Sequence, residues 1–449
     1  MMQCETYRKP DNGGEETVAE DYTYNVGLST VDITPPVGIY LSGFAARNER
    51  STGVYHPLRA TAVAIDDGTN PLLIVGAEIL GFYERAPRVR AAIQEATGLD
   101  TAHVILNGSH THCGPSLREI DGERHGELDQ GYIDGLVQKI ARCASEAWEG
   151  RQPARLLTGL GRCDIAVSRR KPDTRGGVTW APSPASGHDH EVPVIAVERP
   201  DGVLAGVLFS YASHPTSRGG LEIGGDYVGF ALDRVEETHS GTVACFMQGC
   251  GADQKTRPVD PNATTFVPRE VPEIKDIGED LGDAVSVVLK SGGLRPVSGP
   301  ISVRQSTLTL ESEPVDWDLV EKGLKDGNWL IKEWAEKLQG ARDRGEEIVR
   351  HFPFEVQTVT FGKSMALVTL AGEITVEHGL RLKRELRPRF DHVMSLGYCN
   401  EMMGYVPVKR QIPEGGYEVW FAQQVWRRSG PFVEDTEEKI HSEIQRMLE

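Results

Sequence analysis

Two histidines, two residues apart, directly follow a short apolar segment of this 449-residue chain. The segment Val104–Leu106 has the pattern of a β-strand, and it leads through Asn-Gly-Ser to His110 and His112, then to a Gly-Pro pair. A tight turn at the end of a strand holds imidazoles rigidly in a cleft and leaves a metal ion open to substrate. The spacing therefore predicts a metal-bearing loop, and the alternative is an ordinary polar loop.

Two later segments repeat this order of an apolar strand, a small residue and a donor side chain. His214 follows the run Val207–Tyr211, and Glu373 follows Ala366–Leu370. Strand ends on one side of a sheet are where sites are assembled from distant parts of a sequence. Two histidines and one glutamate are the ligand types of hydrolytic zinc, which keeps a position free for water. Because Pro215 comes next, a purely structural turn is the alternative for His214.

The elements that must position these residues alternate between strands and helices. Two β-rich runs around an Asp-Asp-Gly-Thr-Asn turn predict a hairpin, and apolar residues at helical spacing predict helices between later strands. The expected strands are 58–65, 72–76, 104–106, 192–197, 203–211, 243–247, 366–370 and 393–396, and the expected helices lie within 87–96, 133–144, 281–288, 316–347, 376–386 and 434–448. This alternation predicts an α/β fold with a layered mixed β-sheet, flanking helices and the metal site at strand ends.

Composition limits the possible partners. The formal net charge of -18 gives no basic footprint for nucleic acid and argues against an anionic membrane surface. Residues 1–24 form a polar leader without the apolar core of a secretory signal, and no run approaches the ~20 apolar residues of a membrane span. Seven cysteines without a CxxC pair favour reduced thiols. We therefore expect a cytoplasmic protein that acts on a small molecule, with its oligomeric state undetermined by the sequence.

Several of these motifs, in unchanged order from about Gly27 to Glu449, resemble the catalytic domain of the neutral ceramidase family. They are Val-Asp-Ile-Thr-Pro at 31–35, His-Thr-His-Cys-Gly-Pro at 110–115, Ser-His-Pro-Thr-Ser at 213–217, Gly-Gly-Asp-Tyr-Val-Gly at 224–229, Gly372-Glu373 and Gly404-Tyr405. Members of that family are zinc-dependent amidases that hydrolyse the N-acyl bond of ceramide. The resemblance implies one catalytic domain over 25–449, without the C-terminal immunoglobulin-like domain of the secreted members.

The resemblance also implies roles for individual residues. Its zinc ligands correspond to His110, His214, Glu373 and Tyr405. His112 corresponds to a histidine that faces the metal-bound water or the scissile amide without ligating the metal. Imidazole suits proton transfer near neutral pH, which the poor leaving group of an amide requires.

Two more positions match donors toward the oxyanion of the tetrahedral intermediate. Arg169, which stands beside Arg170, matches a site arginine of the family, and Tyr417 matches a tyrosine placed to stabilise that intermediate. Such donors contribute a few kcal/mol each. The alternative for Tyr417 is a surface tyrosine in a turn.

The chain departs from the family in the loop after the strand 243–247. Lys255 stands where the family has a serine, whereas Asp253 is retained at an aspartate position and is expected to orient the loop. The lysine is either a charge partner for an anionic substrate or leaving group, or a solvated side chain. A further expectation is that Asp226 caps a helix that begins at Tyr227.

Taken together, the motifs predict a zinc-dependent hydrolase that cleaves an amide or ester bond by attack of metal-activated water. The missing signal and immunoglobulin-like domain favour a substrate smaller and more polar than ceramide. An amidohydrolase-type barrel, which also begins its metal site with His-x-His, is one alternative. A non-catalytic, ligand-binding member of the family is the other, and Lys255 makes it conceivable.

Overall fold

The computed structural model describes residues 24–258 and 260–449, and the predicted leader lies outside them except for Tyr24, which is buried in the first strand. A nine-stranded mixed sheet has the order β12-β10-β9-β6-β1-β3-β4-β5, with β14 (Arg295–Pro296) also paired to β6. Its strands are β1 (Tyr24–Asp32), β3 (Arg59–Asp66), β4 (Pro71–Ala77), β5 (Val104–Gly108), β6 (Gln152–Arg162), β9 (Glu191–Glu198), β10 (Leu204–Tyr211) and β12 (Val243–Gln248). The pairs β4–β5 and β10–β12 are parallel.

A second sheet has four strands in the order β15-β16-β17-β19. Its members are β15 (Ile301–Glu311), β16 (His351–Phe361), β17 (Met365–Leu370) and β19 (His392–Leu396), and β17 and β19 run parallel. Smaller sheets join β13 (Gln254–Thr256), β7 (Ala166–Pro172) and β8 (Val178–Ser183), then β2 (Gly53–Val54) with β11 (Glu222–Ile223), and β18 (Glu373–Ile374) with β20 (Tyr405–Val406).

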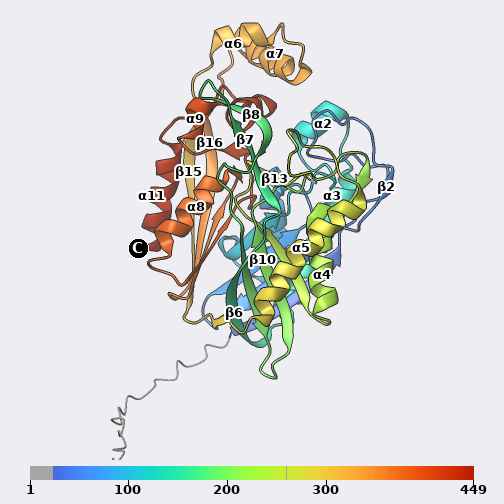
Figure 1. Ribbon diagram of the computed structural model, residues 1–449, viewed down its shortest axis with the longest axis vertical. Helices are drawn as coiled ribbons and strands as arrows, with labels where there is room; N and C mark the ends of the chain where they lie inside the picture. The colour runs from blue at the N-terminus through green and yellow to red at the C-terminus, as the bar shows by residue number, and fades with distance from the viewer. Residues whose placement is uncertain (1–23, 259) are drawn as a thin grey trace, which may run out of the picture.

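Side chains that alternate along the strands divide the molecule into four layers, helix, sheet, sheet and helix. On β10, for example, Val207 and Phe209 pack against α4 (Asp226–Thr238) and α5 (Val271–Lys290), whereas Leu208 points into the core between the two sheets. The outer face of the second sheet packs against α8 (Val376–Leu386) and α11 (Thr436–Leu448). Figure 1 shows these two helices on one side and α4 and α5 on the other. Because successive side chains of a strand point to opposite faces, the large sheet contributes to one core on each of its two faces.

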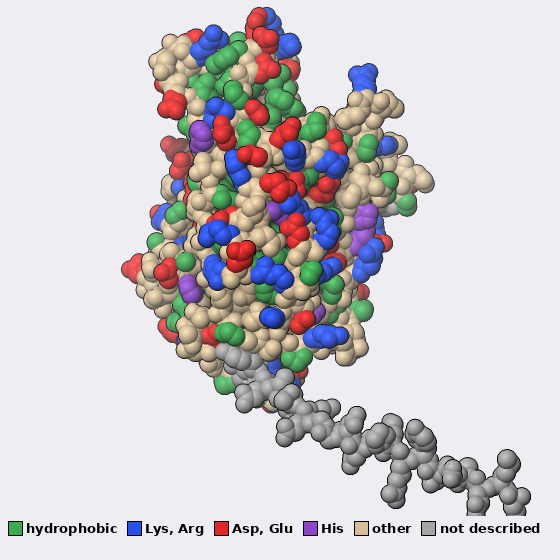
Figure 2. Space-filling model, turned by 90° about the vertical axis from the view of Figure 1, so that its left-hand side faces the viewer, with side chains coloured by type: hydrophobic (Ala, Val, Ile, Leu, Met, Phe, Trp, Pro, Cys, Tyr) green, Lys and Arg blue, Asp and Glu red, His purple; other side chains and the backbone are tan. Residues whose placement is uncertain are grey.

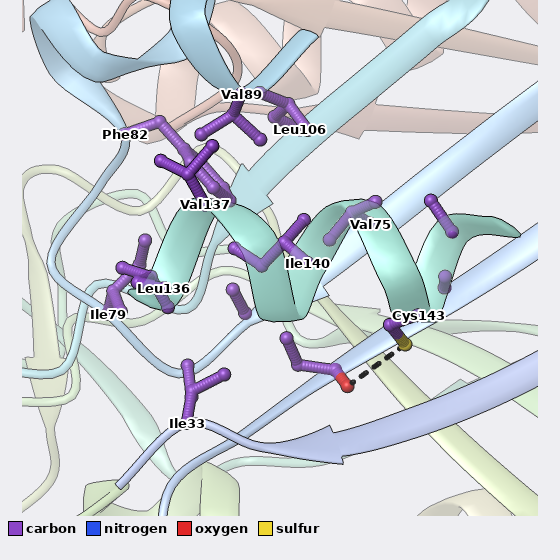
Figure 3. Close-up of a cluster of buried hydrophobic side chains, with 14 of the residues drawn as sticks. Ile33, Val75, Ile79, Phe82, Val89, Leu106, Leu136, Val137, Ile140 and Cys143 are labelled. Carbon is purple, nitrogen blue, oxygen red and sulfur yellow. Dashed lines mark hydrogen bonds between the residues drawn. The ribbon is translucent and has the colours of Figure 1, made fainter. Parts of the chain in front are cut away.

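The rest of the outer face of the large sheet, over β3, β4 and β5, is covered by α1 (Ala86–Thr97) and α3 (Gln130–Glu149). Residues at helical spacing on α3 pack into this core: Figure 3 shows Leu136 near Ile79 and Ile140 near Val75 of β4. The Cys143 thiol faces the Ala60 carbonyl oxygen at 3.8 Å. This apolar stripe is the one that predicts the helix from the sequence, and it anchors the sheet edge that carries His110.

Beyond these layers, α6 (Trp317–Gly323) and α7 (Trp329–Arg344) form a helical projection at the top of the molecule (Figure 1). Short elements near the site are α2 (Glu119–His125), α9 (Gln411–Glu414), a π-helix at Tyr417–Phe421 and α10 (Ala422–Val425). Acidic and basic side chains are interspersed over the face that Figure 2 shows. In the described part of the chain, no helix combines the length and apolar character needed to cross a membrane.

The predicted fold class is confirmed: the fold is layered α/β with flanking helices. The hairpin 58–76, the strand 104–106 and the helix 376–386 lie where the sequence predicts them. The expected helical stretch 316–347 is two helices, because Asp326-Gly327-Asn328 interrupts it and Asn328 caps α7. The prediction for Asp226 is wrong, since α4 begins at this residue itself, with Gly225 at the N-cap and φ of 55° at Asp226.

Candidate metal centre

The ends of three strands meet at Asn107, three residues before His110. Asn107 is wholly buried at the end of β5. Its Oδ1 accepts a 2.7 Å hydrogen bond from the Gln248 backbone N–H at the end of β12, and its Nδ2 donates to the Gly397 carbonyl oxygen at 2.8 Å, just after β19. A buried amide with satisfied hydrogen bonds is a rigid connector. It therefore joins the loops after β5, β12 and β19 where the candidate site lies.

Four of the predicted site residues converge here from distant segments. Glu373 Oε2 lies 3.3 Å from His110 Nε2 and 3.4 Å from His214 Nε2, and Tyr405 Oη lies 3.3 Å from His214 Nε2. Glu373 and Tyr405 are direct partners in the short parallel sheet β18–β20. His110 has a φ of 68°, a left-handed backbone conformation that costs ~1–2 kcal/mol in a non-glycine residue. Strain of this kind is held where a side chain must point in one direction.

The proton positions in this cluster decide whether it suits a metal ion. His110 Nδ1 lies 2.7 Å from the Leu80 carbonyl oxygen and His214 Nδ1 lies 2.9 Å from the Gly251 carbonyl oxygen. A carbonyl oxygen only accepts, so each Nδ1 carries the proton and each Nε2 presents a lone pair. Glu373 Oε2 is buried without a hydrogen-bond partner. Three acceptor atoms thus face one another, an arrangement that a cation stabilises.

The spacing of these atoms also suits a metal. Ligands held ~2.0–2.1 Å from a tetrahedral zinc ion lie ~3.3 Å from one another. The three distances of 3.3 to 3.4 Å match this edge length. The donor set, with imidazole nitrogen, carboxylate oxygen and phenol oxygen, therefore fits zinc in both chemistry and spacing.

Burial and neighbouring charges set the protonation of the cluster. Burial, together with the positive charge of Arg169, lowers the pKa of His214 to about 3. Burial alone would raise the pKa of Glu373, but the imidazoles of His110 and His214 outweigh it and lower the pKa below its ordinary value. His214 is therefore neutral and Glu373 ionised at neutral pH. These are the states in which both side chains bind a metal ion.

His112 belongs to the same group but differs from the other two histidines. The three imidazoles of His110, His112 and His214 form a buried group with ligand atoms within 4.8 Å of one another, which could hold a metal ion. His112 Nε2 lies 3.3 Å from His110 Nε2, whereas His112 Nδ1 has no hydrogen-bond partner among the described residues. Without a carbonyl to fix its tautomer, this ring is less suited to ligation and better suited to moving a proton.

The absence of a side chain at Gly43 leaves room for the His112 ring. A Cβ atom at Gly43 would lie 2.4 Å from His112 Cγ, and the φ of 101° is one that glycine adopts readily. The Phe44 ring then packs against the imidazole, with ring centroids 4.8 Å apart. The glycine-rich loop near residue 43 therefore positions the histidine that the sequence assigns to proton transfer.

Arg169 and Tyr417 lie beside Tyr405. Arg169 Nη2 donates to Tyr405 Oη at 3.1 Å, and its guanidinium carbon lies 5.0 Å from the centroid of the Tyr417 ring. Arg169 Nε also donates to Glu418 Oε1 at 2.7 Å. Arg170 contacts Glu418 on its other oxygen and points away from the histidines. Of the two adjacent arginines, Arg169 is thus the one that faces the cluster.

Asp253 and Lys255 lie outside the ligand cluster. The buried Asp253 carboxylate accepts from the Val376 backbone N–H at 2.8 Å and from Gln411 Nε2 at 3.0 Å, so it orients loops, as its sequence position suggests. Lys255 is half-buried, and its Nζ donates to the Thr216 carbonyl oxygen at 3.0 Å and to Thr216 Oγ1 at 2.7 Å. Burial and the charge of Arg169 lower the pKa of Lys255 to about 7. A freely solvated lysine is therefore the wrong interpretation of this position.

The Asp226 carboxylate holds the loop that follows His214. It accepts from the Ser217 backbone N–H at 2.8 Å and from the Tyr227 backbone N–H at 2.8 Å. The two cysteines near the site are poor nucleophiles, since burial raises the pKa of the Cys113 thiol to about 11 and the Cys250 thiol is buried as well.

A cavity of about 220 Å³ opens beside the imidazoles. Most of its wall is apolar or aromatic, and the lining comes from seven separate segments of the chain, one of them Leu330 of α7. Its lining comprises Gly43, Phe44, Ala45, Ala46, Leu80, Tyr83, His110, His112, Arg118, Leu330, Glu373, Tyr405, Tyr417, Phe421, Ala422, Val425 and Trp426. Apolar walls with a few convergent polar groups are typical of small-molecule sites.

Three residues that organise this site are not predicted from the sequence, namely Asn107, Glu418 and Gly43. Asn107 and Glu418 each give a weak signal, because each is a polar residue in an apolar run. A buried polar group needs a hydrogen-bond partner. The partners of both residues lie far away in the sequence. Gly43 carries no signal of its own, because only the position of His112 reveals the close approach.

The architecture and the histidine cluster define a layered α/β protein with a candidate metal centre. No family model matches the chain. Neutral ceramidases A and B of Dictyostelium discoideum are 28% and 25% identical over 243 and 250 residues, which is 50% and 53% of this chain. Those matches cover 33% and 35% of the relatives, so this chain aligns with about a third of their length.

Solved structures show the fold more completely. The crystal structure of neutral ceramidase from Pseudomonas aeruginosa has a TM-score of 0.72 at 20% identity and covers 91% of this chain and 73% of that one. A structure of ceramidase complexed with C2 has a TM-score of 0.71 at 18% identity, with the same coverage. The chain is neutral-ceramidase-like, which confirms the resemblance. The barrel alternative is wrong, since the two large sheets of the described residues are a mixed nine-stranded sheet and a four-stranded one, and neither is a barrel of eight parallel strands.

Proposed function

We propose that this protein is a zinc-dependent hydrolase that cleaves an amide (N-acyl) or ester bond of a small acyl substrate. The observation that carries the proposal is the convergence of His110 Nε2, His214 Nε2 and Glu373 Oε2, while both Nδ1 atoms contact carbonyl oxygens. Three buried acceptors at this distance need a cation. The neutral ceramidases, whose fold the chain shares, provide the expectation that the reaction is amide hydrolysis.

In this proposal His110, His214, Glu373 and Tyr405 hold the ion. When bound, zinc supplies a Lewis acid that polarises the scissile carbonyl and lowers the pKa of water to about 7. The other side chains bind, orient and move protons. Burial raises the pKa of Tyr405 well above its usual value, so its hydroxyl stays protonated as a neutral oxygen donor.

His112 is the proton carrier of the proposed site. Burial, then the neighbouring His110 and His214, lowers the pKa of its imidazole well below the usual value, so the ring is neutral at neutral pH. It could take a proton at one face of the substrate and deliver it to the leaving nitrogen or oxygen. An amide needs this delivery most, because an unprotonated amine anion leaves poorly.

Arg169 and Tyr417 provide hydrogen-bond donors toward the carbonyl oxygen as negative charge develops on it. Glu418 fixes the orientation of the Arg169 guanidinium, and the Tyr417 ring lines the cavity. A donor that is already oriented costs no reorganisation in the transition state. The lining therefore supports a tetrahedral transition state next to the imidazoles.

The cavity supports a substrate smaller than ceramide. Its volume of about 220 Å³ lies below the ~300–1,000 Å³ of sites for drug-sized ligands. Its apolar lining, with Phe44, Phe421 and Trp426, suits a short acyl group. We propose that this group occupies the cavity and that the polar part of the substrate lies outside it.

Metal analysis and a turnover screen test the proposal. We expect one zinc ion per chain and hydrolysis of N-acyl compounds or esters, with the highest kcat/KM at short acyl length. A folded protein that binds no metal would overturn the hydrolase assignment. One zinc with no turnover across amides and esters of varied chain length would instead favour the non-catalytic ligand-binding alternative.

A further inference from the structure

A second cavity, of about 570 Å³, is lined in part by Thr216 and Ser217, which follow His214 in the chain. Its inner wall is formed by Thr216, Ser217, Lys255, Thr256 and Arg269, and we refer to these five residues as the Lys255 pocket. None of them lines the cavity beside the imidazoles. The pocket is therefore a separate compartment whose chemistry the proposed reaction does not use.

The Lys255 pocket contains two cations without a carboxylate partner. Lys255 Nζ donates only to Thr216, and the buried Arg269 guanidinium donates to the Arg257 carbonyl oxygen. Neither forms an ion pair with any residue in the ranges 24–258 and 260–449. A charge removed from water is costly unless a counter-charge compensates it.

The acidic side chains near the pocket accept hydrogen bonds from backbone N–H groups. The Asp226 carboxylate holds the backbone N–H groups of Ser217 and Tyr227. The Glu273 carboxylate accepts from the Glu270 backbone N–H at 2.9 Å in the capping box of α5. Asp260 also lines the pocket, and its carboxylate accepts from the Asn262 backbone N–H at 2.9 Å. Among the described residues, none of these three carboxylates forms an ion pair with Lys255 or Arg269.

Hydroxyl groups complete the inner wall. Ser217 Oγ and Thr256 Oγ1 lie 3.2 Å apart, and Thr216 Oγ1 lies 2.7 Å from Lys255 Nζ. Two cations with three hydroxyl donors match the needs of an oxyanion, which accepts several charge-assisted hydrogen bonds at once. The Phe266 ring, whose centroid lies 5.4 Å from Lys255 Nζ, covers one side.

The pocket adjoins the candidate metal centre directly. His214 and Lys255 are backbone bridge partners, and Thr216 comes two residues after His214. A row of aromatic rings also connects the two cavities: Tyr417 lies 4.8 Å from Trp180, and Trp180 lies 6.5 Å from Phe266. A substrate whose scissile bond lies at the imidazoles would have its polar end close to Lys255.

We propose that the Lys255 pocket binds an oxyanion, and that this oxyanion is an acidic group, carboxylate or phosphate, on the non-acyl side of the substrate. This inference rests on the proposed function for the identity of the ligand, but not for the existence of the oxyanion site. It assigns the substrate to the class of N-acyl or O-acyl compounds with an acidic substituent.

The first arm of the test measures binding without any reaction. Inorganic phosphate is titrated calorimetrically into the zinc-loaded full chain, into Lys255→Met and Arg269→Gln, and into Arg257→Gln as a matched control. Arg257 lies nearby, but Asp164 and Asp280 already compensate its charge. We expect millimolar or tighter binding that weakens at least tenfold in the first two variants and is unchanged in the control. Absence of binding to the parent chain, or equal binding by Lys255→Met, would overturn the oxyanion site.

The second arm identifies the source of the anion. Two N-acyl substrates are compared that differ only in a carboxylate or a carboxamide on the amine side. We expect at least a tenfold higher kcat/KM for the carboxylate, competition by phosphate, loss of the preference in Lys255→Met and its recovery in Lys255→Arg. Phosphate binding that depends on Lys255, without any substrate preference, would overturn the substrate assignment and leave a site for a free anion. Phosphate binding with no hydrolysis of either compound would overturn the proposed function alone. Circular dichroism melting curves identify any variant that fails to fold, and Arg269→Gln then replaces Lys255→Met.

Discussion

Glu418 Oε1 lies 2.7 Å from Arg169 Nε, and both side chains are almost wholly buried. The second oxygen of the same carboxylate accepts from Arg170 Nη1, also at 2.7 Å. One buried carboxylate therefore bridges two adjacent guanidinium groups and fixes the position of each. Because a bidentate carboxylate restricts the orientation of its partners, Glu418 acts on the site through Arg169.

Glu418→Gln tests this relationship. The amide retains the shape but leaves Arg169 without a counter-charge, so we expect the free energy of unfolding to fall by about 3 kcal/mol and kcat/KM to fall by ~10–100-fold. Zinc content should not change. Glu414→Gln is the matched control, since Glu414 pairs only with Arg170 and with the exposed Arg410, and we expect a loss within about 1 kcal/mol. Equal effects of the two variants on kcat/KM would contradict a positioning role.

Substitution of the three histidines is expected to affect zinc content and kcat/KM differently. His110→Ala and His214→Ala should each abolish stoichiometric zinc, because each removes an Nε2 that faces Glu373. His112→Gln should retain the metal and lose ~10²–10⁴-fold in kcat/KM, since it removes the proton carrier. Inductively coupled plasma mass spectrometry and steady-state kinetics provide the two measurements, with the exposed His351→Gln as control. Loss of zinc in His112→Gln would make that residue a ligand.

The predictable part of the structure follows from local rules. The strands before His110, His214 and Glu373 are continuous apolar runs, and α8 has a regular apolar stripe, so residue type alone marks them. The strands β15 and β16 escaped prediction because polar residues such as Arg304, Gln305 and Gln357 interrupt the apolar alternation. Eleven residue pairs join these two strands, and backbone hydrogen bonds of this kind leave no trace in the sequence.

The candidate site also contains residues that local patterns predict and residues that they do not. His110, His214 and Glu373 follow from the order of strand, small residue and donor, whereas Tyr405 and Tyr417 come only from family resemblance. The roles of Asn107 and Glu418 depend on contacts between segments far apart in the chain. Such contacts are set by how three strand ends meet, and a single sequence does not encode them in any local pattern.

Gly43→Ala tests whether the backbone around residue 43 positions the His112 imidazole. The new Cβ would lie 2.4 Å from His112 Cγ, so the imidazole must move. Gly38→Ala is a close control, because Gly38 has a similar φ of 97° and no atom within 4 Å of its Cβ position. Both substitutions should cost ~1–2 kcal/mol for the positive φ, but only Gly43→Ala should lower kcat/KM, by at least ~10-fold. Melting temperatures and kinetics of the two variants decide this, and equal kinetic losses would refute it.

Asp121 provides a prediction of how stability depends on pH. Its buried carboxylate accepts from Arg118 Nε at 3.0 Å, from Ser42 Oγ at 2.6 Å and from Ser116 Oγ at 2.9 Å, which joins the loops on both sides of the cavity. Burial alone would raise the pKa of Asp121, but the guanidinium of Arg118 outweighs it and lowers the pKa below its ordinary value.

The sign follows from this lowered pKa. A carboxyl group whose pKa is lower in the folded than in the unfolded protein stabilises the fold at neutral pH and loses that contribution as the pH falls below ~4. We expect Asp121→Asn to lower the free energy of unfolding by about 3 kcal/mol at pH 7, and the gap from the parent chain to narrow as the pH is lowered from 5 toward 3. Urea unfolding at these pH values measures the gap. Asp134→Asn, which breaks an exposed ion pair with Arg88, should change stability by less than about 1 kcal/mol. A gap that stays constant with pH would mean that the Asp121 carboxylate is not the group that titrates.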